Sequence, residues 1–292
     1  MRPLYNRLQE ARPRLRASWE IVERDYLLSW ILAAIGRSEA LNRVLAFKGG
    51  TALKKCFFGD YRFSEDLDFS ALPEAPEGES LEEAIRACCR SAVVMLDGYA
   101  PVDIACERYA EAKPHPGGQE AFTIRCRFPW QREPLTRIKV EITFDEPILR
   151  PLQPRSILHD YEEPLRATVR TYALEEIVAE KLRAILQHIE RLEERGWSRS
   201  RARDYYDLWR IMEAYSDELD LSGFVSFLHE KCAARGVGFH GADSFFREAM
   251  MSYVARTWEQ WLGQLVPDLP SYDTVIQELR PRIDRLLACG SP

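Results

Sequence analysis

The residues whose type and spacing point most directly to chemistry are two aspartates, Asp66 and Asp68. They stand in the string RFSEDLDFS, whose alternation of apolar and polar residues predicts a β-strand. Alternate residues of a strand face the same side, so both carboxylates should project together while Leu67 and Phe69 enter the core. Such a pair repels unless a cation lies between its members, and hard oxygen ligands suit Mg²⁺ or Mn²⁺. A solvated edge strand or a capped turn would explain the pair without chemistry.

The stretch before the aspartates, LAFKGGTAL, reads as a short strand that breaks at Gly49 and Gly50 and continues into a helix over residues 51–58. Glycines at such a turn leave backbone N–H groups open to an anion, and Thr51 adds a hydroxyl. Alone this signal is weak, because a tight connection needs glycine for steric reasons. Followed by the aspartate pair on the next strand, it predicts a phosphate-binding turn beside a metal-binding pair.

Lys181 interrupts an apolar stripe in the predicted helix YALEEIVAEKLRAILQ. A lysine there is usually a snorkelling side chain or an ion-pair partner. If the stripe faces the first part of the chain, however, Lys181 would point into a cleft as a compact cation for phosphate. Methionine at this position is then expected to preserve stability and to remove activity.

A further helix, in RSRARDYYDLWRIM, carries Asp204 and Asp207 three residues apart on one face. Negative charge near a helix start is also favoured by the macrodipole alone. Residues 181–203 hold seven basic and three acidic residues in a chain of net charge −6. This strip fits a triphosphate and an RNA backbone, although a surface helix with Glu–Arg pairs would have the same composition. The arginines expected to border the entry of an acceptor are Arg195, Arg199, Arg201 and Arg203.

The string FKGGTALKKCFFGDYRFSEDLDFS resembles the first motif of the AbiEii/AbiGii toxin family, which belongs to the DNA polymerase β-type nucleotidyltransferase superfamily. That motif is a GGT or GST turn, a leucine, and Arg-x-Ser-x-Asp-x-Asp. It falls on Gly49, Gly50, Thr51, Leu53, Arg62, Ser64, Asp66 and Asp68. The later motifs of the family fall on Lys181 and on Arg203, Asp204, Asp207 and Leu208. The resemblance covers roughly the first 210 residues, and the last 80 carry no motif that matches it.

The superfamily needs a third carboxylate from a neighbouring strand, and the string RIKVEITFDE offers two. Its apolar residues alternate with the polar residues Lys139, Glu141, Thr143 and Asp145. Glu141 in mid-strand is preferred over Asp145 at the strand end. The glutamate would act as a base or an outer ligand, unless both residues simply face water on an amphipathic strand.

The elements that must position these residues change character along the chain. The first 45 residues are expected to be helical, with Gly36 ending a helix. Strands and helices alternate up to residue 146, and a proline-punctuated connector leads to a region of helical period. We therefore expect an α+β fold. A mixed-sheet, polymerase β-like nucleotidyltransferase domain should span residues 1–165, and a helical domain over residues 166–292 should contribute Lys181 and Asp204 to the cleft.

Composition narrows the class of protein. The chain has 292 residues, 46% of them apolar, and its negative charge argues against a protein that coats nucleic acid non-specifically. Its seven cysteines show no metal-ligand spacing, which predicts free thiols in a reducing cytoplasm. No stretch predicts a signal peptide or a membrane span. The histidines, including His115 in an expected loop, have no metal-ligand spacing either.

The resemblance implies a toxin that transfers nucleotides from an NTP to an acceptor such as the 3′ end of tRNA, with a cognate antitoxin. It implies Mg²⁺ or Mn²⁺ on Asp66 and Asp68, and the phosphates near the GGT turn, Arg62 and Ser64. It makes Lys181, Asp204 and Glu141 catalytic, with Asp207 beside the substrate. A protein or small-molecule acceptor, or a non-catalytic member of the fold, remain the alternatives.

Overall fold

The computed structural model describes residues 2–109 and 118–289, and the expected loop residue His115 lies outside them. The helices are α1 (Leu4–Leu15), α2 (Trp19–Arg37), α3 (Glu39–Asn42), α4 (Gly49–Ala52), α5 (Gly78–Asp97), α6 (Leu174–Arg195), α7 (Ala202–Ala214), α8 (Phe224–Ala233), α9 (Glu248–Leu262) and α10 (Tyr272–Cys289), with a π-helical turn at Leu53–Phe57 and a 3₁₀ turn at Ala242–Phe245. The strands are β1 (Leu45–Lys48), β2 (Asp66–Ala71), β3 (Asp103–Tyr109), β4 (Gln119–Arg127), β5 (Thr136–Thr143), β6 (Gln153–Ser156) and β7 (Thr168–Thr171).

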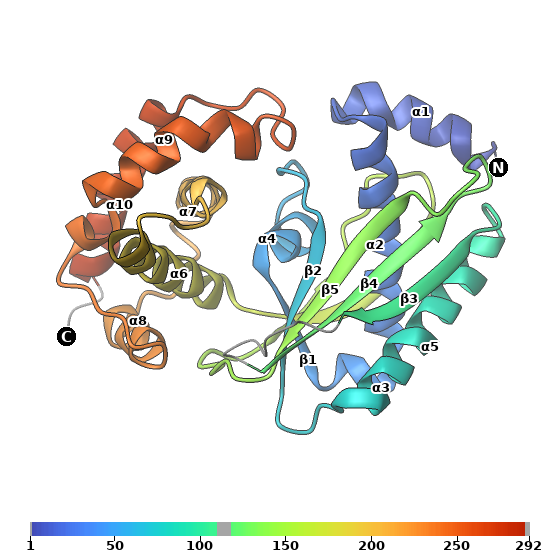
Figure 1. The fold of residues 1–292 in the computed structure, drawn as a ribbon, viewed down its shortest axis with the longest axis horizontal. Coiled ribbons are helices and arrows are strands. Elements are labelled where there is room, and N and C mark those ends of the chain that lie inside the picture. Colours follow the sequence, from blue (N-terminus) through green and yellow to red (C-terminus); the bar gives the residue numbers. More distant parts are fainter. Residues whose placement is uncertain (1, 110–117, 290–292) are drawn as a thin grey trace. The chain divides into compact units, whose positions relative to one another are not determined.

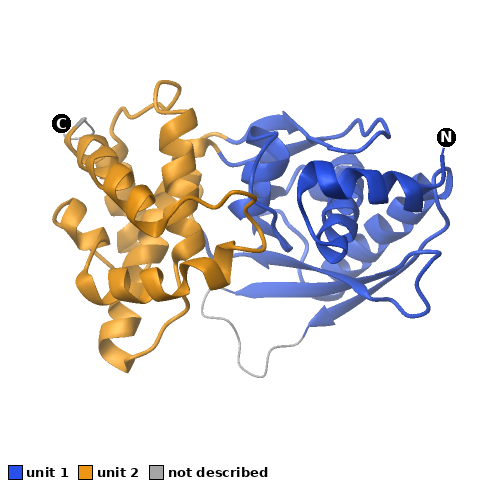
Figure 2. Cartoon of the chain, turned by 90° about the horizontal axis from the view of Figure 1, so that it is seen from above, with its two compact units in different colours: residues 1–146, 152–172 blue, residues 147–151, 173–292 orange. Residues whose placement is uncertain are grey.

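Two compact units make up the chain (Figure 2). Unit 1 comprises residues 1–146 and 152–172, and unit 2 comprises residues 147–151 and 173–292. Unit 1 holds every described strand, and unit 2 is helical. The expected α+β class, with a mixed sheet followed by a helical region, is confirmed. Domains bounded at residues 1–165 and 166–292 stay a prediction.

The sheet of unit 1 has seven strands in the order β3-β4-β5-β2-β1-β7-β6. Strand β2 pairs parallel with β5 and antiparallel with β1, and β1 pairs parallel with β7. The remaining neighbours are antiparallel. Strand β2, which carries both aspartates, is therefore central, so the alternative of a solvated edge strand is wrong.

The two faces of the sheet differ in character. On one face, apolar residues such as Phe47 and Phe69, whose ring centroids lie 5.1 Å apart, are fully buried. Helices α2 and α5 pack on each other, α2 against β5 and β7 and α5 against β3 (Figure 1). Thr136 of β5 lies on this helix-covered face of the sheet, because its hydroxyl is 3.4 Å from the Glu23 carboxylate of α2. Alternation along β5 then places Lys139 and Glu141 on the opposite face, which we call the open face.

The connector after residue 146 differs from the expectation. It contains β6 and leads into β7, a hairpin at the edge of the sheet that proline-rich sequence concealed. Helix α2 continues through Gly36 to Arg37, one residue beyond the expected end. Six of the cysteines are free and buried, as predicted for the part of the chain whose side chains are described.

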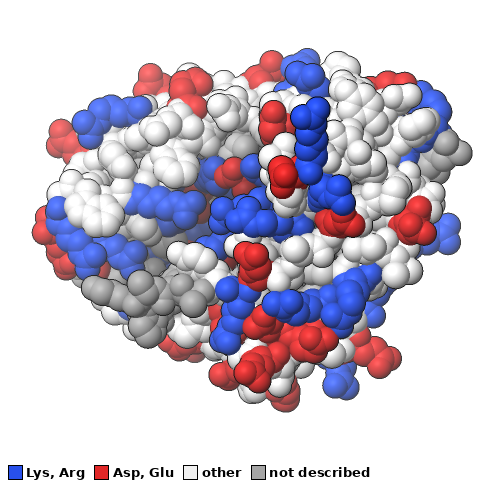
Figure 3. Space-filling view, turned by 45° about the vertical axis from the view of Figure 1, so that its right-hand side comes forward, with Lys and Arg blue, Asp and Glu red and all other residues white. Residues whose placement is uncertain are grey.

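Surface composition agrees with the sequence. Figure 3 shows Lys and Arg interspersed with Asp and Glu over the face that it presents, with neither sign covering it alone. Within residues 2–109 and 118–289, no helix is both long enough and apolar enough to cross a membrane.

Candidate active site

Asp66 and Asp68 stand two residues apart on β2, and both are partly exposed. The residues that alternate with them, Leu67 and Phe69, are 0% and 1% exposed, as predicted. Asp68 is the register partner of Glu141 on β5 and Asp66 that of Lys139, so all four side chains share the open face. Two acidic residues and their neighbours on β5 are thus brought to one patch of the sheet.

Gly49 and Gly50 allow close approach of two charged side chains. A Cβ on Gly49 would lie 2.4 Å from Asp68 Oδ2, and one on Gly50 would lie 2.2 Å from a terminal nitrogen of Arg62. Gly49 also has a φ of 77°, in the left-handed region that favours glycine. Any larger residue at either position would push the Asp68 carboxylate or the Arg62 guanidinium away. The turn therefore fixes the position of the site's own charges, a role that its steric reading did not suggest.

Thr51 connects the glycine turn to β2. Its hydroxyl is hydrogen bonded to the carbonyl oxygen of Asp66 and lies 2.6 Å from Ser64 Oγ. Because a carbonyl only accepts, Thr51 donates to it and is left to accept from Ser64. Thr51 is fully buried, so its hydroxyl holds the start of β2 in place. Its expected role as a substrate-binding residue stays a prediction.

Arg62 is buried beside this turn, with 4% of its surface exposed. Its guanidinium donates to the carbonyl oxygen of Phe63 at 3.2 Å and lies 5.8 Å from the ring centroid of Tyr61. These contacts lock the direction of the side chain toward Gly50. A fixed guanidinium is suited to planar recognition of a phosphate.

The candidate third carboxylates differ in position. Glu141 lies in mid-strand and forms an ion pair with Lys139, whose side chain is 28% exposed. Asp145 is exposed and follows the end of β5 at Thr143. Glu141 is the residue that the sheet places beside Asp68, and the preference for it over Asp145 as the third carboxylate stays a prediction.

The donor set bears on whether a divalent cation fits this site. In the described part of the chain, no group of three or more His, Cys, Asp or Glu residues could hold a metal ion. Two partly exposed carboxylates do fit a cation such as Mg²⁺, which keeps several waters and takes other ligands from substrate phosphates. The missing side chain of Gly49 allows the Asp68 carboxylate to lie close to the turn, where a Cβ would displace it. The residues therefore fit a hydrated ion and do not form an all-protein cage.

Unit 2 contains a separate charged cluster around Lys181 of α6. The Lys181 ammonium lies 3.1 Å from Asp204 Oδ1 and 2.5 Å from Asp207 Oδ2, both on α7. Asp207 is fully buried, and the side chains of Lys181 and Asp204 are 8% and 13% exposed. Three residues from two separate motifs are thus brought together. The contacts show Lys181 as an ion-pair partner, one of the readings that its place on the apolar stripe suggested, and its role in catalysis stays a prediction.

Two further residues, Arg201 and His188, belong to this cluster, and the sequence analysis did not identify them as partners of Asp204. Arg201 donates to Asp204 Oδ2 at 2.7 Å and to His188 Nε2 at 2.8 Å. Since arginine only donates, His188 Nε2 accepts, and its Nδ1–H donates to Ser198 Oγ at 2.6 Å. Burial, with a smaller contribution from Arg201, lowers the pKa of His188 to about 3. The sequence spacing could have indicated that His188 lies near Lys181, because it follows Lys181 by seven residues on the same helix face.

The arginines expected to receive an acceptor have unequal surroundings. Arg195 and Arg199 are exposed, and Arg199 lies 5.5 Å from the ring centroid of Trp261. Arg203 lies 5.4 Å from the same ring. Arg201, in contrast, is held inside the cluster, and burial lowers its pKa. Arg201 is therefore not a free member of the basic strip.

The chain is similar to a known protein family and to a solved structure. The family described as nucleotidyl transferase AbiEii toxin, type IV TA system, matches residues 30–288. The match extends through the last 80 residues, where no motif was recognised. A search of curated proteins finds no match. Among solved structures, MenT4, a nucleotidyltransferase toxin from Mycobacterium tuberculosis H37Rv, has 21% sequence identity and a TM-score of 0.59, with coverage of 92% of this chain and 84% of that chain.

Proposed function

The chain belongs to the AbiEii nucleotidyltransferase toxin family of type IV toxin–antitoxin systems, and we propose that it transfers nucleotides from an NTP to the 3′ end of tRNA. Such an addition would block translation, because a tRNA with an altered 3′ end cannot be charged or used. The observation that carries the proposal is the placement of Asp68 beside Glu141 and against Gly49 on the open face. The reaction would take place in the cytoplasm, where NTP and tRNA are present.

In the proposed reaction an acceptor hydroxyl attacks the α-phosphorus of the NTP. A new P–O bond forms, the bond to pyrophosphate breaks, and the hydroxyl proton passes to Glu141 as base. Asp66 and Asp68 would hold Mg²⁺ or Mn²⁺. When bound, the ion would supply charge neutralisation for the phosphates and lower the pKa of the attacking hydroxyl. Arg62 would neutralise phosphate charge from its fixed position beside Gly50.

Backbone N–H groups of the glycine turn would bind the phosphate oxygens of the NTP. Ser64, which is partly exposed, would add a hydroxyl, while Thr51 supports the turn from beneath. The tight approach of Asp68 to Gly49 supports a compact site for one phosphate group and its counter-ion.

In unit 2, Lys181 would serve as a cation for phosphate. Asp204 and Asp207 would hold its ammonium in one direction, as their distances of 3.1 and 2.5 Å suggest. With Arg201 on its second oxygen, Asp204 is occupied by two cations, which makes it a poor base and a good positioning residue. Glu141 has one such partner, Lys139, against two for Asp204, and it lies beside Asp68, so we assign the base to Glu141. A cognate antitoxin would restrain the toxin.

The test is incubation of the full chain with total tRNA, Mg²⁺ and each labelled NTP in turn. Wild type should label tRNA with at least one NTP, and excess EDTA should abolish labelling. Asp66→Asn and Asp68→Asn should each lose about 10²-fold or more of the rate, since removing one electrostatic group of a transition state has this effect. Melting curves should be unchanged, because neither side chain is in the core.

Asp145→Asn is the matched control, since it removes the same charge from an exposed position beyond the end of β5. It should keep the wild-type rate, whereas Glu141→Gln should lose most of it. A loss in Asp145→Asn with full activity in Glu141→Gln would reverse this assignment. Labelling of proteins or small molecules in a cell extract, with tRNA unlabelled, would contradict the acceptor and keep the chemistry.

A further inference from the structure

Two arginines face each other directly across neighbouring strands of the open face. Arg125 of β4 and Arg137 of β5 are register partners, and alternation places both on the same side as Lys139 and Glu141. Arg125 is partly exposed and Arg137 is exposed. Like charges directly opposite each other in a sheet are destabilising, so this arrangement has a cost within the free protein.

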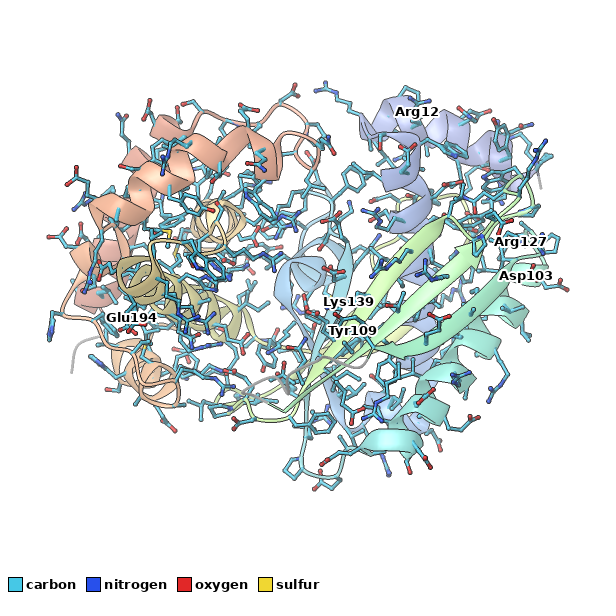
Figure 4. The ribbon with its side chains drawn as sticks, in the orientation of Figure 1. Arg12, Asp103, Tyr109, Arg127, Lys139 and Glu194 are labelled. Carbon is cyan, nitrogen blue, oxygen red and sulfur yellow. The ribbon has the colours of Figure 1, made fainter. Side chains whose placement is uncertain are left out.

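Neither arginine has an acidic partner among residues 2–109 and 118–289. Their neighbours on the same face are matched to partners of their own, as Arg127 pairs with Asp103 and Lys139 pairs with Glu141. Figure 4 shows these flanking residues, with Arg127 beside Asp103 toward one end of the strands and Lys139 beside Tyr109 farther along. By register, the two arginines lie between these places. The face thus carries a doubled positive charge that the protein leaves uncompensated.

The residues beside the arginine pair on this face are small. Ala105 of β3 is exposed and is the register partner of Arg125, whereas Ala121 and Thr123, which precede Arg125 on β4, are buried. The acidic residues of β3 that face the same way are Glu107, the register partner of Thr123, and Asp103, which pairs with Arg127.

The arginine pair leads toward the aspartates. Arg137 precedes Lys139 by two residues, which is about 7 Å along a strand, and Lys139 is the register partner of Asp66. Tyr109 is 50% exposed, and the Lys139 ammonium lies over its ring, 5.4 Å from the ring centroid. An aromatic ring beside a line of cations is the usual combination for stacking a base and holding its phosphates.

We propose that Arg125 and Arg137 bind consecutive backbone phosphates of the RNA acceptor and guide its 3′ end along the open face toward Asp66 and Asp68. Lys139 and Tyr109 complete this phosphate track, with the tyrosine ring stacking a base near the 3′ end. The inference rests on the proposed function, since it names how that function's RNA acceptor is held. It assigns the acceptor to unit 1, whereas the sequence alone suggested the basic strip of residues 181–203.

The experiment measures binding of labelled tRNA and of a short single-stranded RNA in EDTA, so that no transfer occurs, over a series of salt concentrations. Arg125→Ala/Arg137→Ala should weaken binding roughly 10-fold or more at low salt, as loss of charge-assisted contacts predicts. The log–log salt slope should fall by roughly one to two units. Arg125→Lys/Arg137→Lys should retain most of the slope, because it preserves both charges.

Arg86→Ala/Arg90→Ala is the matched control. It removes two exposed arginines from α5, a helix on the covered side of the same unit. This control should keep the wild-type affinity and slope. Equal slopes in wild type and in Arg125→Ala/Arg137→Ala, or equal losses in both alanine pairs, would overturn the proposal.

Failure of the inference and failure of the proposed function are separable. If wild type transfers nucleotides to tRNA and the double alanine variant does so with unchanged KM and salt slope, the track is wrong and the function stands. If RNA binding depends on the two arginines and no NTP labels RNA, the function fails and the track stands. Absence of RNA binding by wild type would overturn the track.

Discussion

Unit 2 contains two buried lysines with nearly the same partners, and the difference between them separates a structural charge from a candidate catalytic one. Lys181 of α6 contacts two aspartates, and Lys231 of α8 contacts the glutamates Glu176 and Glu180 at 2.9 and 3.4 Å. Each lysine interrupts a buried helix surface. Counting ion pairs would not distinguish them.

The Lys231 ammonium is fully enclosed, although its second carboxylate partner, Glu180, keeps 14% of its side chain exposed. Lys231 and Glu176 are both fully buried, and the ammonium also donates to the carbonyl oxygen of Pro147 at 2.7 Å. Glu176 accepts from the backbone N–H groups of Leu149 and Arg150 at 3.2 and 2.8 Å. The cluster thereby attaches residues 147–151 to the helices of unit 2. The charged groups of Lys231 and Glu176 therefore bind backbone atoms and hold this segment in place.

The Lys181 cluster is open at one end. The Lys181 side chain is 8% exposed, against 0% for Lys231, and Asp204 continues through Arg201 and His188 to Ser198. A phosphate could therefore approach without breaking the fold of the backbone. The comparison teaches that a buried lysine becomes a candidate for chemistry when its carboxylates orient it and the lysine side chain itself still reaches solvent.

The sharpest way to break this comparison is to change both lysines to methionine. Lys181→Met should reduce nucleotide transfer per folded molecule by about 10²-fold or more, because a preorganised cation for phosphate is lost. Lys231→Met should leave that activity close to wild type. Labelling of tRNA, normalised to the folded fraction by circular dichroism, measures both.

Stability should respond in the opposite order. Lys231→Met leaves the fully buried Glu176 without its cation and should cost about 3–5 kcal/mol in urea unfolding. Lys181→Met should cost less, since Asp204 keeps Arg201. Because the buried Asp207 loses a contact at 2.5 Å, we now expect a small decrease in stability, where the sequence predicted that stability is kept or slightly raised. Equal activity losses in both variants would show that the two lysines have one kind of role.

Sequence patterns predicted the elements whose physical signal is local. The break at Gly49 and the alternation around Asp66 and Asp68 indicated β1 and β2, because strand periodicity and glycine turns act over a few residues. The strand expected over residues 62–70 begins only at Asp66. The family motifs also indicated which polar residues belong together. The edge hairpin of β6 and β7 was missed, since Pro154 occupies a strand position that proline rarely adopts.

Contacts between distant segments could not be predicted from one sequence. Lys181 and Asp207 are 26 residues apart, and their pairing depends on how α6 packs against α7. The opposition of Arg125 and Arg137 depends on the register of β4 and β5, which a shift of one residue would abolish. Side-chain partners of this kind are properties of tertiary packing, so only the structure reveals them.

A smaller effect is expected when the orienting arginine is removed. Arg201→Gln should lower kcat by roughly 10-fold with little change in the KM for NTP, because the substitution loosens Asp204 and through it Lys181. Arg201→Lys should restore part of the rate. In a Lys181→Met background, Arg201→Gln should have almost no further effect on the rate, since residues that act as a unit are not additive. Independent, additive losses would separate Arg201 from the Lys181 cluster.

The smallest effect concerns His188, at the end of the open cluster. Its pKa is lowered to about 3 by burial and, to a lesser degree, by Arg201, so the native ring is neutral from about pH 5 to 9. The pH–rate profile over that range should therefore have the same shape in wild type and in His188→Gln, because the glutamine amide keeps both an acceptor and a donor.

The pH dependence of stability should differ between the two proteins. Below pH 6.5 the unfolded chain takes up a proton on His188 while the native state does not, so this residue's contribution to stability falls as pH drops from 6.5 toward 3. Urea unfolding at a series of pH values should show a shallower acid decline in His188→Gln than in wild type. If His188→Gln instead removed an activity limb near pH 6.5, the native ring would titrate there, and the cluster would carry a variable charge that the Lys231 cluster lacks.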